Sequence, residues 1–384
     1  MKTKISILIP VFNEAKCLPK LFQALEKQKL SFPAEIVFID NNSEDNSLNL
    51  LGDWRKKNKN KFLKIRIYNE KKQGFAYPLK LGIQKASAPL IAITDADCLP
   101  MTDWIKKMCA ALKNTDICVG NTYSYIGKKS SEAEKLAALF FKDYSKKCAR
   151  ADGFALPWGP TCNLGFHKKL TEKISTFSEH AGPAFDIDFC WRAILQEAKL
   201  HYNKDICVKH FRRDTPEALY KQMYRYGSGE AWIRYRYSSI FEINNTSSKL
   251  SYTENSAKLA KKNAKLRILK MPAPSSLKKL KQDAAEAFAK GVYDGYKKLN
   301  KKKSPEIILR KSVAWENATG GVSIFVPGRG ALDLNKKMAP VWILYKSSKN
   351  VNHFSKLLIK KLGMQKNDAN HYAEEFFTAL NPLT

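Results

Sequence analysis

The chain has 384 residues, enough to bury a substantial core and to form more than one domain. Its apolar content of 44% excludes a disordered or collagen-like chain. With 67 Lys and Arg against 36 Asp and Glu, the formal net charge is +31, which favours anionic partners such as nucleic acid, anionic lipid or phosphorylated substrates.

Strand and helix signals alternate over the first quarter of the chain. Apolar runs predict strands at 5–12, 35–40, 62–68 and 90–94, and helical spacing predicts helices at 17–28, 48–57 and 76–86. This alternation predicts a mostly parallel central sheet flanked by helices, with ligands beyond the carboxyl ends of the strands. The apolar run 5–9 ends at Pro10, so we interpret it as a strand and not as a signal peptide. No stretch reaches the ~18–20 apolar residues that a membrane-spanning helix needs, so any membrane contact is expected to be peripheral.

Acidic side chains follow three of these predicted strands. Asp95 and Asp97 end the fourth strand, Asp40 ends the second, and Glu14 follows the first. Crowded carboxylates repel one another near a core, and a hard cation such as Mg²⁺ or Mn²⁺ would compensate them. A capped turn explains the two aspartates equally well when this segment is considered alone. The convergence of three strand ends favours a functional crevice.

An ordered series of motifs resembles the family 2 glycosyltransferases with the GT-A fold. The segments are ISILIPVFNEA, IVFIDNNSEDNS, QGFAYPLKLGIQKA, IAITDADCLP, CNLGFHKKL, FDIDFCWRA, VKHF and QMYRYGSG, and together they span about residues 4–229. Neither a G-x-G-x-x-G sequence after the first strand nor a Walker A sequence is present. The resemblance implies an α/β GT-A catalytic domain over 1–235, followed by a basic, mainly helical α+β region over 236–384.

The resemblance also implies the residues that bind a nucleotide diphosphate sugar, with a UDP-sugar favoured. They are Pro10, Phe12, Glu14, Asp40, Lys80, Asp95, Ala96, Asp97 and Arg225. By the same resemblance Asp97, Asp95 and His210 are ligands of Mn²⁺ or Mg²⁺. Lys80 stands where the family often has Arg-Asn, and a solvated helix lysine is an alternative for it. A structural histidine is the alternative for His210, and an Asx turn is the alternative for Asp40.

The segment FDIDF, residues 185–189, is the predicted base site. Family members have a Glu-Asp pair here; this chain has Phe185 and Asp186. The resemblance makes Asp186 the catalytic base, and Asp188 is the second choice. It also implies that Trp158, Gly159 and Tyr226 bind the acceptor, although a core tryptophan is an equally good interpretation of Trp158.

The region after about residue 235 resembles no family. Residues 277–303 predict one lysine-rich helix with an apolar stripe at Leu277, Leu280, Ala284, Phe288, Val292, Tyr296 and Leu299. We expect this stripe to pack on the catalytic domain; binding to an anionic bilayer surface is the alternative. Strands are predicted at 320–330 and 339–347, and a helix pair at 353–363 and 368–380. No recognised DNA-binding motif is present, so nucleic acid is not the expected partner.

Taken together, these patterns predict an inverting, metal-dependent glycosyltransferase that acts on a glycan or lipid-linked acceptor in cell-envelope polysaccharide synthesis. Eight scattered cysteines without a Cys-x-x-Cys pair favour reduced thiols, hence a cytoplasmic enzyme, peripheral at the inner face of the membrane. One alternative is an inactive GT-A-like protein that binds membrane or nucleic acid through its basic surface. A nucleotidyltransferase would explain Asp95 and Asp97 but not the later motifs.

Overall fold

The computed structural model describes residues 2–58, 63–151, 155–237 and 254–302 continuously. Beyond these it describes three short strands within 314–335 and the segments 350–362, 365–367, 369–371 and 373–374. The predicted strand at 339–347 lies outside the described residues, as does most of the predicted helix at 368–380.

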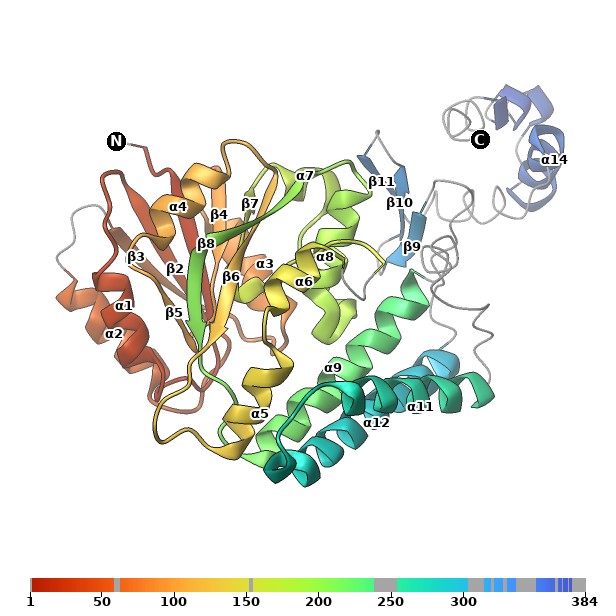
Figure 1. Cartoon of the computed structure of the whole chain (residues 1–384). Helices are drawn as coiled ribbons and strands as arrows, with labels where there is room; N and C mark the ends of the chain where they lie inside the picture. The colour runs from red at the N-terminus through yellow and green to blue at the C-terminus, as the bar shows by residue number, and fades with distance from the viewer. Residues whose placement is uncertain are drawn as a thin grey trace.

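An eight-stranded sheet forms the centre of the molecule (Figure 1). Its strand order is β3-β2-β1-β4-β7-β6-β8-β5. The strands are β1 (Ile5–Val11), β2 (Ala34–Asp40), β3 (Leu63–Asn69), β4 (Leu90–Ile93), β5 (Cys98–Pro100), β6 (Ile117–Ser124), β7 (Leu164–His167) and β8 (Leu200–His210). The pairs β1–β2, β2–β3, β1–β4 and β6–β8 are parallel, whereas β7 and β5 pair antiparallel with their neighbours. The four predicted strands are therefore confirmed, as is a mixed sheet in which parallel pairs predominate.

Helices cover both faces of this sheet. The first half contributes α1 (Leu18–Glu26), α2 (Ser47–Lys57), α3 (Ala76–Lys85) and α4 (Trp104–Ala111). The second half adds α5 (Glu132–Phe140), α6 (Tyr144–Ala149), η1 (Thr161–Asn163), α7 (Leu170–Ile174), η2 (Glu179–Ala184), α8 (Phe185–Ile194) and α9 (Pro216–Arg236). Two apolar clusters result, one on each face, and strands such as β2 are buried along their whole length. That double burial explains why these strands read as continuous apolar runs and not as alternating patterns.

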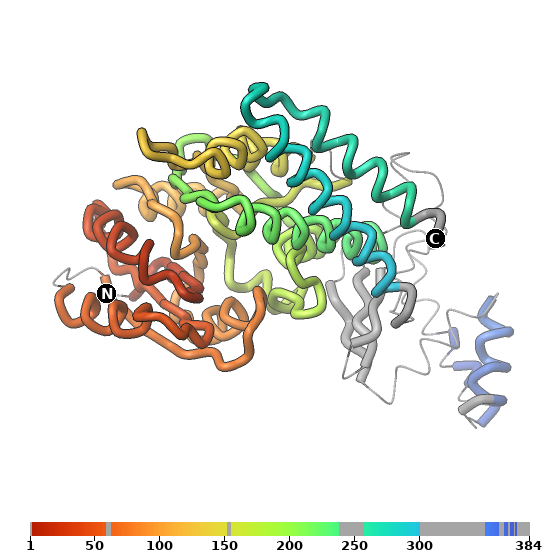
Figure 2. Tube along the Cα trace, turned by 90° about the horizontal axis from the view of Figure 1, so that it is seen from below, coloured from red at the N-terminus to blue at the C-terminus, as the bar shows by residue number. Residues whose placement is uncertain are grey.

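A helical layer packs beside the sheet and includes residues beyond the predicted boundary at 235. It consists of α5, α9, α11 (Glu254–Lys270) and α12 (Lys278–Lys302), preceded by the short η3 (Ser275–Leu277). Figure 2 shows α12 running alongside α9, with α11 packed on α12. Leu277, Phe288, Val292 and Tyr296 of the predicted stripe are buried in the cluster that these helices share, so the packing expected for the stripe is confirmed.

The remaining described elements form a small sheet and one further helix. Strands β9 (Ala314–Ala318), β10 (Gly321–Val326) and β11 (Gly330–Asn335) pair antiparallel in the order β11-β10-β9. Helix α14 spans Val351–Leu362, close to the predicted 353–363. No helix among the described residues is both long enough and apolar enough to span a membrane.

Candidate active site

The loops that follow β1 and β2 are joined by hydrogen bonds, which fixes the position of Glu14. The Glu14 amide donates to Ser47 Oγ at 2.9 Å, and the Ala15 amide donates to Asp45 Oδ2 at 2.9 Å. Asn13 has a left-handed backbone, with φ 55°, and its Oδ1 accepts from the Glu44 amide at 2.8 Å. Asparagine tolerates this conformation better than most residues do, because its short side chain bonds locally. The turn therefore directs the Glu14 side chain toward the acids that follow β4.

Asp40 lies at the end of β2 with 1% of its surface exposed. Its Oδ2 accepts from the Ser43 amide at 3.2 Å and from Asn69 Nδ2 at 3.1 Å. Its Oδ1 is buried and has no hydrogen-bond partner among the described residues. A buried carboxylate oxygen without a partner is costly, so this atom is suited to accept a hydrogen bond from a ligand. The Asx-type turn and an unpartnered buried oxygen thus coexist in one side chain.

Asp95 and Asp97 end β4 and face the crevice beside Glu14. Burial, reinforced by the charges of Asp97 and Glu14, raises the pKa of Asp95 well above its usual range. Burial and the charge of Asp97 likewise raise the pKa of Glu14 to about 7. The main chain of Asp97 is tied to β8, because its carbonyl accepts from the Phe211 amide at 2.9 Å. Three carboxylates from two strand ends therefore share one poorly hydrated volume.

Two nitrogen-bearing side chains, from the end of β8 and the segment after it, approach Asp97. His210 Nε2 lies 3.7 Å from Asp97 Oδ1, and Arg213 Nη2 lies 3.5 Å from Asp97 Oδ2. Burial lowers the pKa of His210 to about 4, so its imidazole is neutral at physiological pH. His210 Nδ1 is in hydrogen-bond contact with the Phe211 carbonyl, which fixes the proton there and leaves Nε2 as the basic nitrogen facing Asp97.

Asp186 is at the beginning of α8, apart from the other acids but within their electrostatic reach. It is partly exposed, and its Oδ1 accepts from the Ile187 amide at 2.9 Å. Burial raises the pKa of Asp186 to about 7, and its charge in turn raises the pKa of Asp95. Asp186 is thus a carboxyl group at the edge of the crevice whose pKa is close to neutral pH.

Asp188 differs completely, because it is fully buried in an ion-pair network. Its Oδ2 accepts from Arg192 Nε at 2.8 Å, and its Oδ1 accepts from Arg236 Nε at 3.1 Å and from Tyr237 Oη at 2.7 Å. Although burial alone would raise the pKa of Asp188, the two guanidinium groups hold it below its usual range. These bonds join α8 to the end of α9, which favours a structural role and leaves Asp186 as the preferred base.

The remaining predicted site residues lie in varied surroundings. Lys80 is paired with Glu179, Nζ to Oε2 at 2.6 Å, so it is not available to a phosphate without breaking that pair. Arg225 and Tyr226 are exposed on α9; the Arg225 guanidinium lies 5.8 Å from the Phe75 ring centroid. Tyr226 packs edge-on against Phe141 with the ring centroids 5.9 Å apart.

The predicted acceptor residues Trp158 and Gly159 are in the core. Trp158 is 3% exposed and packs edge-on against Tyr144 with the ring centroids 5.8 Å apart. A Cβ added to Gly159 would lie 2.4 Å from Val119 Cγ2, so this glycine permits close packing on β6. The core alternative fits these contacts better than a ring face that stacks on a sugar. Pro10 and Ala96 belong to the crevice by position, and Phe12 is 47% exposed at its rim.

Sequence reasoning missed two residues that organise the crevice. Asn163, buried in η1, accepts from Trp104 Nε1 at 2.8 Å and donates to the carbonyls of Asn121 and Ile206, both at 2.9 Å. Cys162, its neighbour, lies 3.6 Å from Thr122 Oγ1. Their sequence signal is their place at the start of the CNLGFHKKL motif, which belongs to the resemblance but gives no role to either side chain.

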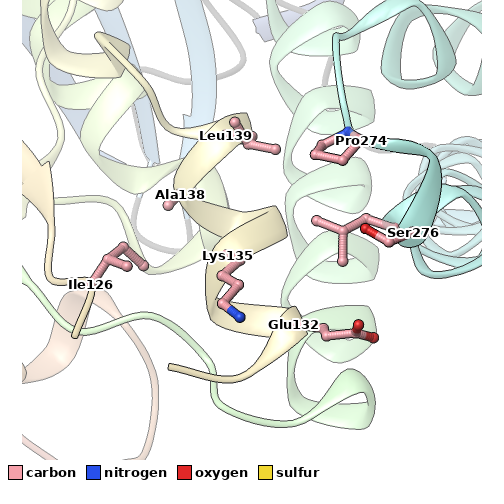
Figure 3. Close-up of a pocket in the computed structure, with 8 residues that line it drawn as sticks. Ile126, Glu132, Lys135, Ala138, Leu139, Pro274 and Ser276 are labelled. Carbon is pink, nitrogen blue, oxygen red and sulfur yellow. The ribbon is translucent and has the colours of Figure 1, made fainter. Parts of the chain in front are cut away.

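A separate pocket of about 380 Å³ lies between α5 and the α11–α12 connection (Figure 3). Its walls are largely apolar, with Glu132 and Lys135 as the charged exceptions, and it is lined by Ile126, Glu132, Lys135, Ala138, Leu139, Pro274, Ser276 and Leu277. None of the carboxylates described above lines it.

Comparison with known proteins finds similarity to glycosyltransferases. The sequence model described as Glycosyl transferase family 2 matches residues 6–175. Glycosyltransferase AglE of Haloferax volcanii is 26% identical over 237 residues, covering 60% of this chain and 73% of AglE. A Methanococcus voltae dolichyl N-acetyl-α-D-glucosaminyl phosphate 3-β-D-2,3-diacetamido-2,3-dideoxy-β-D-glucuronosyltransferase is 26% identical over 250 residues, covering 62% of this chain and 76% of that enzyme.

Solved structures with a related arrangement include a mannosyltransferase from Pyrobaculum calidifontis in complex with GDP-Man and Mn²⁺. Its TM-score is 0.46 at 15% identity, covering 79% of this chain and 76% of that one. Residues 1–349 of TarS from S. aureus in complex with UDP give a TM-score of 0.43 at 16% identity, covering 85% of this chain and 98% of that one.

The sheet with acids at its strand ends and the family match together define an α/β glycosyltransferase of the GT-A type. Residues 6–175 therefore match the model of glycosyl transferase family 2, in agreement with the resemblance that the motifs of the sequence indicate.

Proposed function

We propose that this protein is an inverting, metal-dependent glycosyltransferase that moves a sugar from a nucleotide diphosphate sugar to an acceptor hydroxyl. The observation that carries the proposal is the separation of Asp186 from the acids around Asp97. Asp186, whose pKa is raised to about 7, lies at the edge of the crevice. Glu14, Asp95 and Asp97 lie close together inside the crevice. A base that is free of the metal and a separate oxygen-ligand set are what this reaction requires.

The donor site is assigned to the ends of β1, β2 and β4. The unpartnered Oδ1 of Asp40 suits an N–H donor on a nucleobase edge, such as N3–H of uracil, which is why a UDP-sugar is favoured. Pro10, Phe12 and Glu14 border the same space, with Glu14 toward the ribose. Arg213 and Arg225 supply positive charge for the diphosphate; Lys80 would have to leave Glu179 to contribute.

The residues present fit a divalent cation. Asp95 and Asp97 offer carboxylate oxygens, and the neutral His210 offers Nε2, with its Nδ1 held by the Phe211 carbonyl. Mn²⁺ or Mg²⁺ bound there would neutralise the diphosphate as it leaves. The raised pKa values of Asp95 and Glu14 describe the crowding that such an ion would relieve.

Asp186 would take the proton from the acceptor hydroxyl. The hydroxyl oxygen then attacks the anomeric carbon from the face opposite the diphosphate, so the bond to the diphosphate breaks and the configuration inverts. A carboxylate with a pKa of about 7 is a well-matched base at neutral pH. Tyr226, exposed on α9, is the side chain placed to contact the acceptor.

The acceptor class is a glycan or a lipid-linked sugar, as in cell-envelope polysaccharide synthesis. Support comes from the Methanococcus voltae relative, whose name gives a dolichyl-phosphate-linked sugar as its acceptor. A glycosyltransferase of this kind would work at the inner face of a membrane without crossing it.

Asp97→Asn tests the donor and metal assignment. In calorimetric titration we expect the wild-type protein to bind UDP only in the presence of Mn²⁺ or Mg²⁺. The variant should bind UDP and metal about 10–100-fold more weakly, because it lacks a charged oxygen ligand. The control is Asp53→Asn, an exposed acid on α2 whose loss should change nothing. Circular dichroism verifies the fold. If Asp97→Asn bound UDP and metal like wild type, the assignment would be wrong.

A further inference from the structure

Two buried thiols lie directly beside the carboxylate crevice. Asp95, Cys98, Cys162 and His210 each offer one ligand atom, and all four atoms lie within 4.8 Å of one another. Cys98 and His210 are register partners in the antiparallel pair β5–β8, and Cys162 is brought in by η1. Three segments that are distant in sequence, one of which carries both Asp95 and Cys98, therefore place sulfur, nitrogen and oxygen ligands around one point.

Both thiols have weak polar contacts. Cys98 Sγ lies 3.9 Å from Asp97 Oδ1, and Cys162 Sγ lies 3.6 Å from Thr122 Oγ1, both only weak hydrogen bonds. For Cys118, by contrast, no hydrogen-bond partner is found in the described part of the chain, and burial alone raises the pKa of its thiol. All eight cysteines are free, so neither Cys98 nor Cys162 is engaged in a disulfide.

We propose that Asp95, Cys98, Cys162 and His210 form a second ligand set, which binds a soft divalent ion such as Zn²⁺. Thiolate and imidazole ligands select Zn²⁺ and its soft relatives, whereas carboxylates with phosphate oxygens select Mg²⁺ or Mn²⁺. Because Asp95 and His210 belong to both sets, one ion excludes the other. The consequence, which rests on the proposed function, is that Zn²⁺ inhibits donor binding.

The geometry needs only a modest closure. With Zn–S about 2.3 Å and Zn–N about 2.0 Å, tetrahedral ligand atoms stand roughly 3.5–3.8 Å apart, so the widest pair must approach by about 1 Å. Both thiols lose their protons to solvent as the ion binds. Two thiolates, one carboxylate and the ion leave one net negative charge, and the Arg213 guanidinium beside Asp97 lies close enough to offset it.

Titration of the metal-free full chain with Co²⁺ tests the ligand set without any activity measurement. We expect a near-ultraviolet thiolate-to-cobalt charge-transfer band and the intense visible bands of tetrahedral Co²⁺, both removed by added Zn²⁺. Cys98→Ser and Cys162→Ser should each lose the charge-transfer intensity in part and weaken Zn²⁺ binding by more than about 100-fold. The matched control is Cys207→Ser, a half-buried thiol on β8 whose Sγ contacts the Lys204 carbonyl.

A second measurement separates this inference from the proposed function. UDP binding with Mn²⁺ is titrated in the presence of Zn²⁺, and we expect Zn²⁺ to abolish it in wild type but not in Cys98→Ser. Wild-type spectra without a thiolate band would overturn the soft-ion site even if UDP and Mn²⁺ bind normally. A thiolate band in a protein that binds no nucleotide would uphold the site and count against the proposed function. If both serine variants misfold, the wild-type cobalt spectrum still decides the question.

Discussion

Asp186 and Asp188 stand two residues apart at the start of α8, yet their surroundings give them opposite properties. Asp188 is fully buried and bonded to Arg192, Arg236 and Tyr237, which stabilise its charge. Asp186 is partly exposed and bonded to a backbone amide, and burial raises its pKa to about 7. Because successive positions of a helix point in different directions, the same residue type becomes a structural anion in one case and a candidate base in the other.

Asp186→Asn and Asp188→Asn should therefore separate activity from stability. Asp186→Asn is expected to keep UDP binding and lose transfer by about 10²–10⁴-fold, as removal of a general base does. Its free energy of unfolding above pH 7 should be unchanged or higher, because a buried charge is removed. Asp188→Asn should lower the free energy of unfolding by about 3–5 kcal/mol, since both arginines lose their partner. Urea unfolding and single-turnover transfer measure the two effects.

The pH profile gives the internal check on this assignment. Asp186 acts when deprotonated, so wild-type transfer should rise with pH through about 7. Near-normal turnover in Asp186→Asn, with the loss confined to a well-folded Asp188→Asn, would move the base to Asp188.

Glycines set the distance between α9 and α12. A Cβ added to Gly291 would lie 1.9 Å from the Tyr224 carbonyl oxygen, and one added to Gly227 would lie 2.1 Å from the Phe288 carbonyl oxygen. Backbone atoms cannot move aside as side-chain ends can. The backbone of α12 therefore packs against Gly227 of α9, and the backbone of α9 packs against Gly291 of α12. This contact secures α12 against the layer that carries Arg225 and Tyr226.

Gly291→Ala should lower the free energy of unfolding by about 1–3 kcal/mol. The energetic cost of the steric overlap is expected to exceed the ~1 kcal/mol that alanine gains in helix propensity. Gly52→Ala in α2 is the control: nothing lies within 4 Å of the added methyl, so a gain of up to ~1 kcal/mol is expected. Urea unfolding measures both variants. Stabilisation of similar size in the two would show that α12 does not pack as described.

At the scale of the whole molecule, the net charge is +31, and the lysine-rich helices α11 and α12 pack against the helices beside the central sheet. α11 and α12 bury their apolar residues against α5 and α9, while lysines such as Lys278, Lys297 and Lys298 remain exposed. Deletion of this region would expose a core, so its electrostatic role has to be tested by charge reversal.

We expect the protein to sediment with anionic vesicles at low salt and to be released as salt screens the attraction. Reversal of Lys297 and Lys298 to Glu should weaken this binding by more than about tenfold, at ~1 kcal/mol per charge. Reversal of Lys56 and Lys57, exposed at the end of α2, is the matched control. Equal binding to neutral vesicles, or none at low salt, would contradict a role at an anionic membrane. Tight salt-dependent binding to duplex DNA alone would favour nucleic acid.

The sequence by itself determined the strands β1 to β4, their parallel pairing and the acids at their ends. Each of those strands is short, apolar and bounded by turn residues, so local pattern and burial point the same way. The resemblance to glycosyl transferase family 2 followed from the order of the motifs, and the family model matches residues 6–175. The apolar stripe on residues 277–299 was also predicted correctly, because the helical periodicity of apolar residues does not depend on the surface against which the helix packs.

Only the tertiary structure decided the environments of individual side chains. Local sequence could not distinguish the surroundings of Asp186 and Asp188, because the partners of Asp188, Arg236 and Tyr237, come from nearly fifty residues further along the chain. It could not bury Trp158, pair Lys80 with Glu179, or bring Cys162 beside Cys98. Burial and charge act through space, so a pKa, an ion pair or a ligand set exists only once distant segments have been folded together.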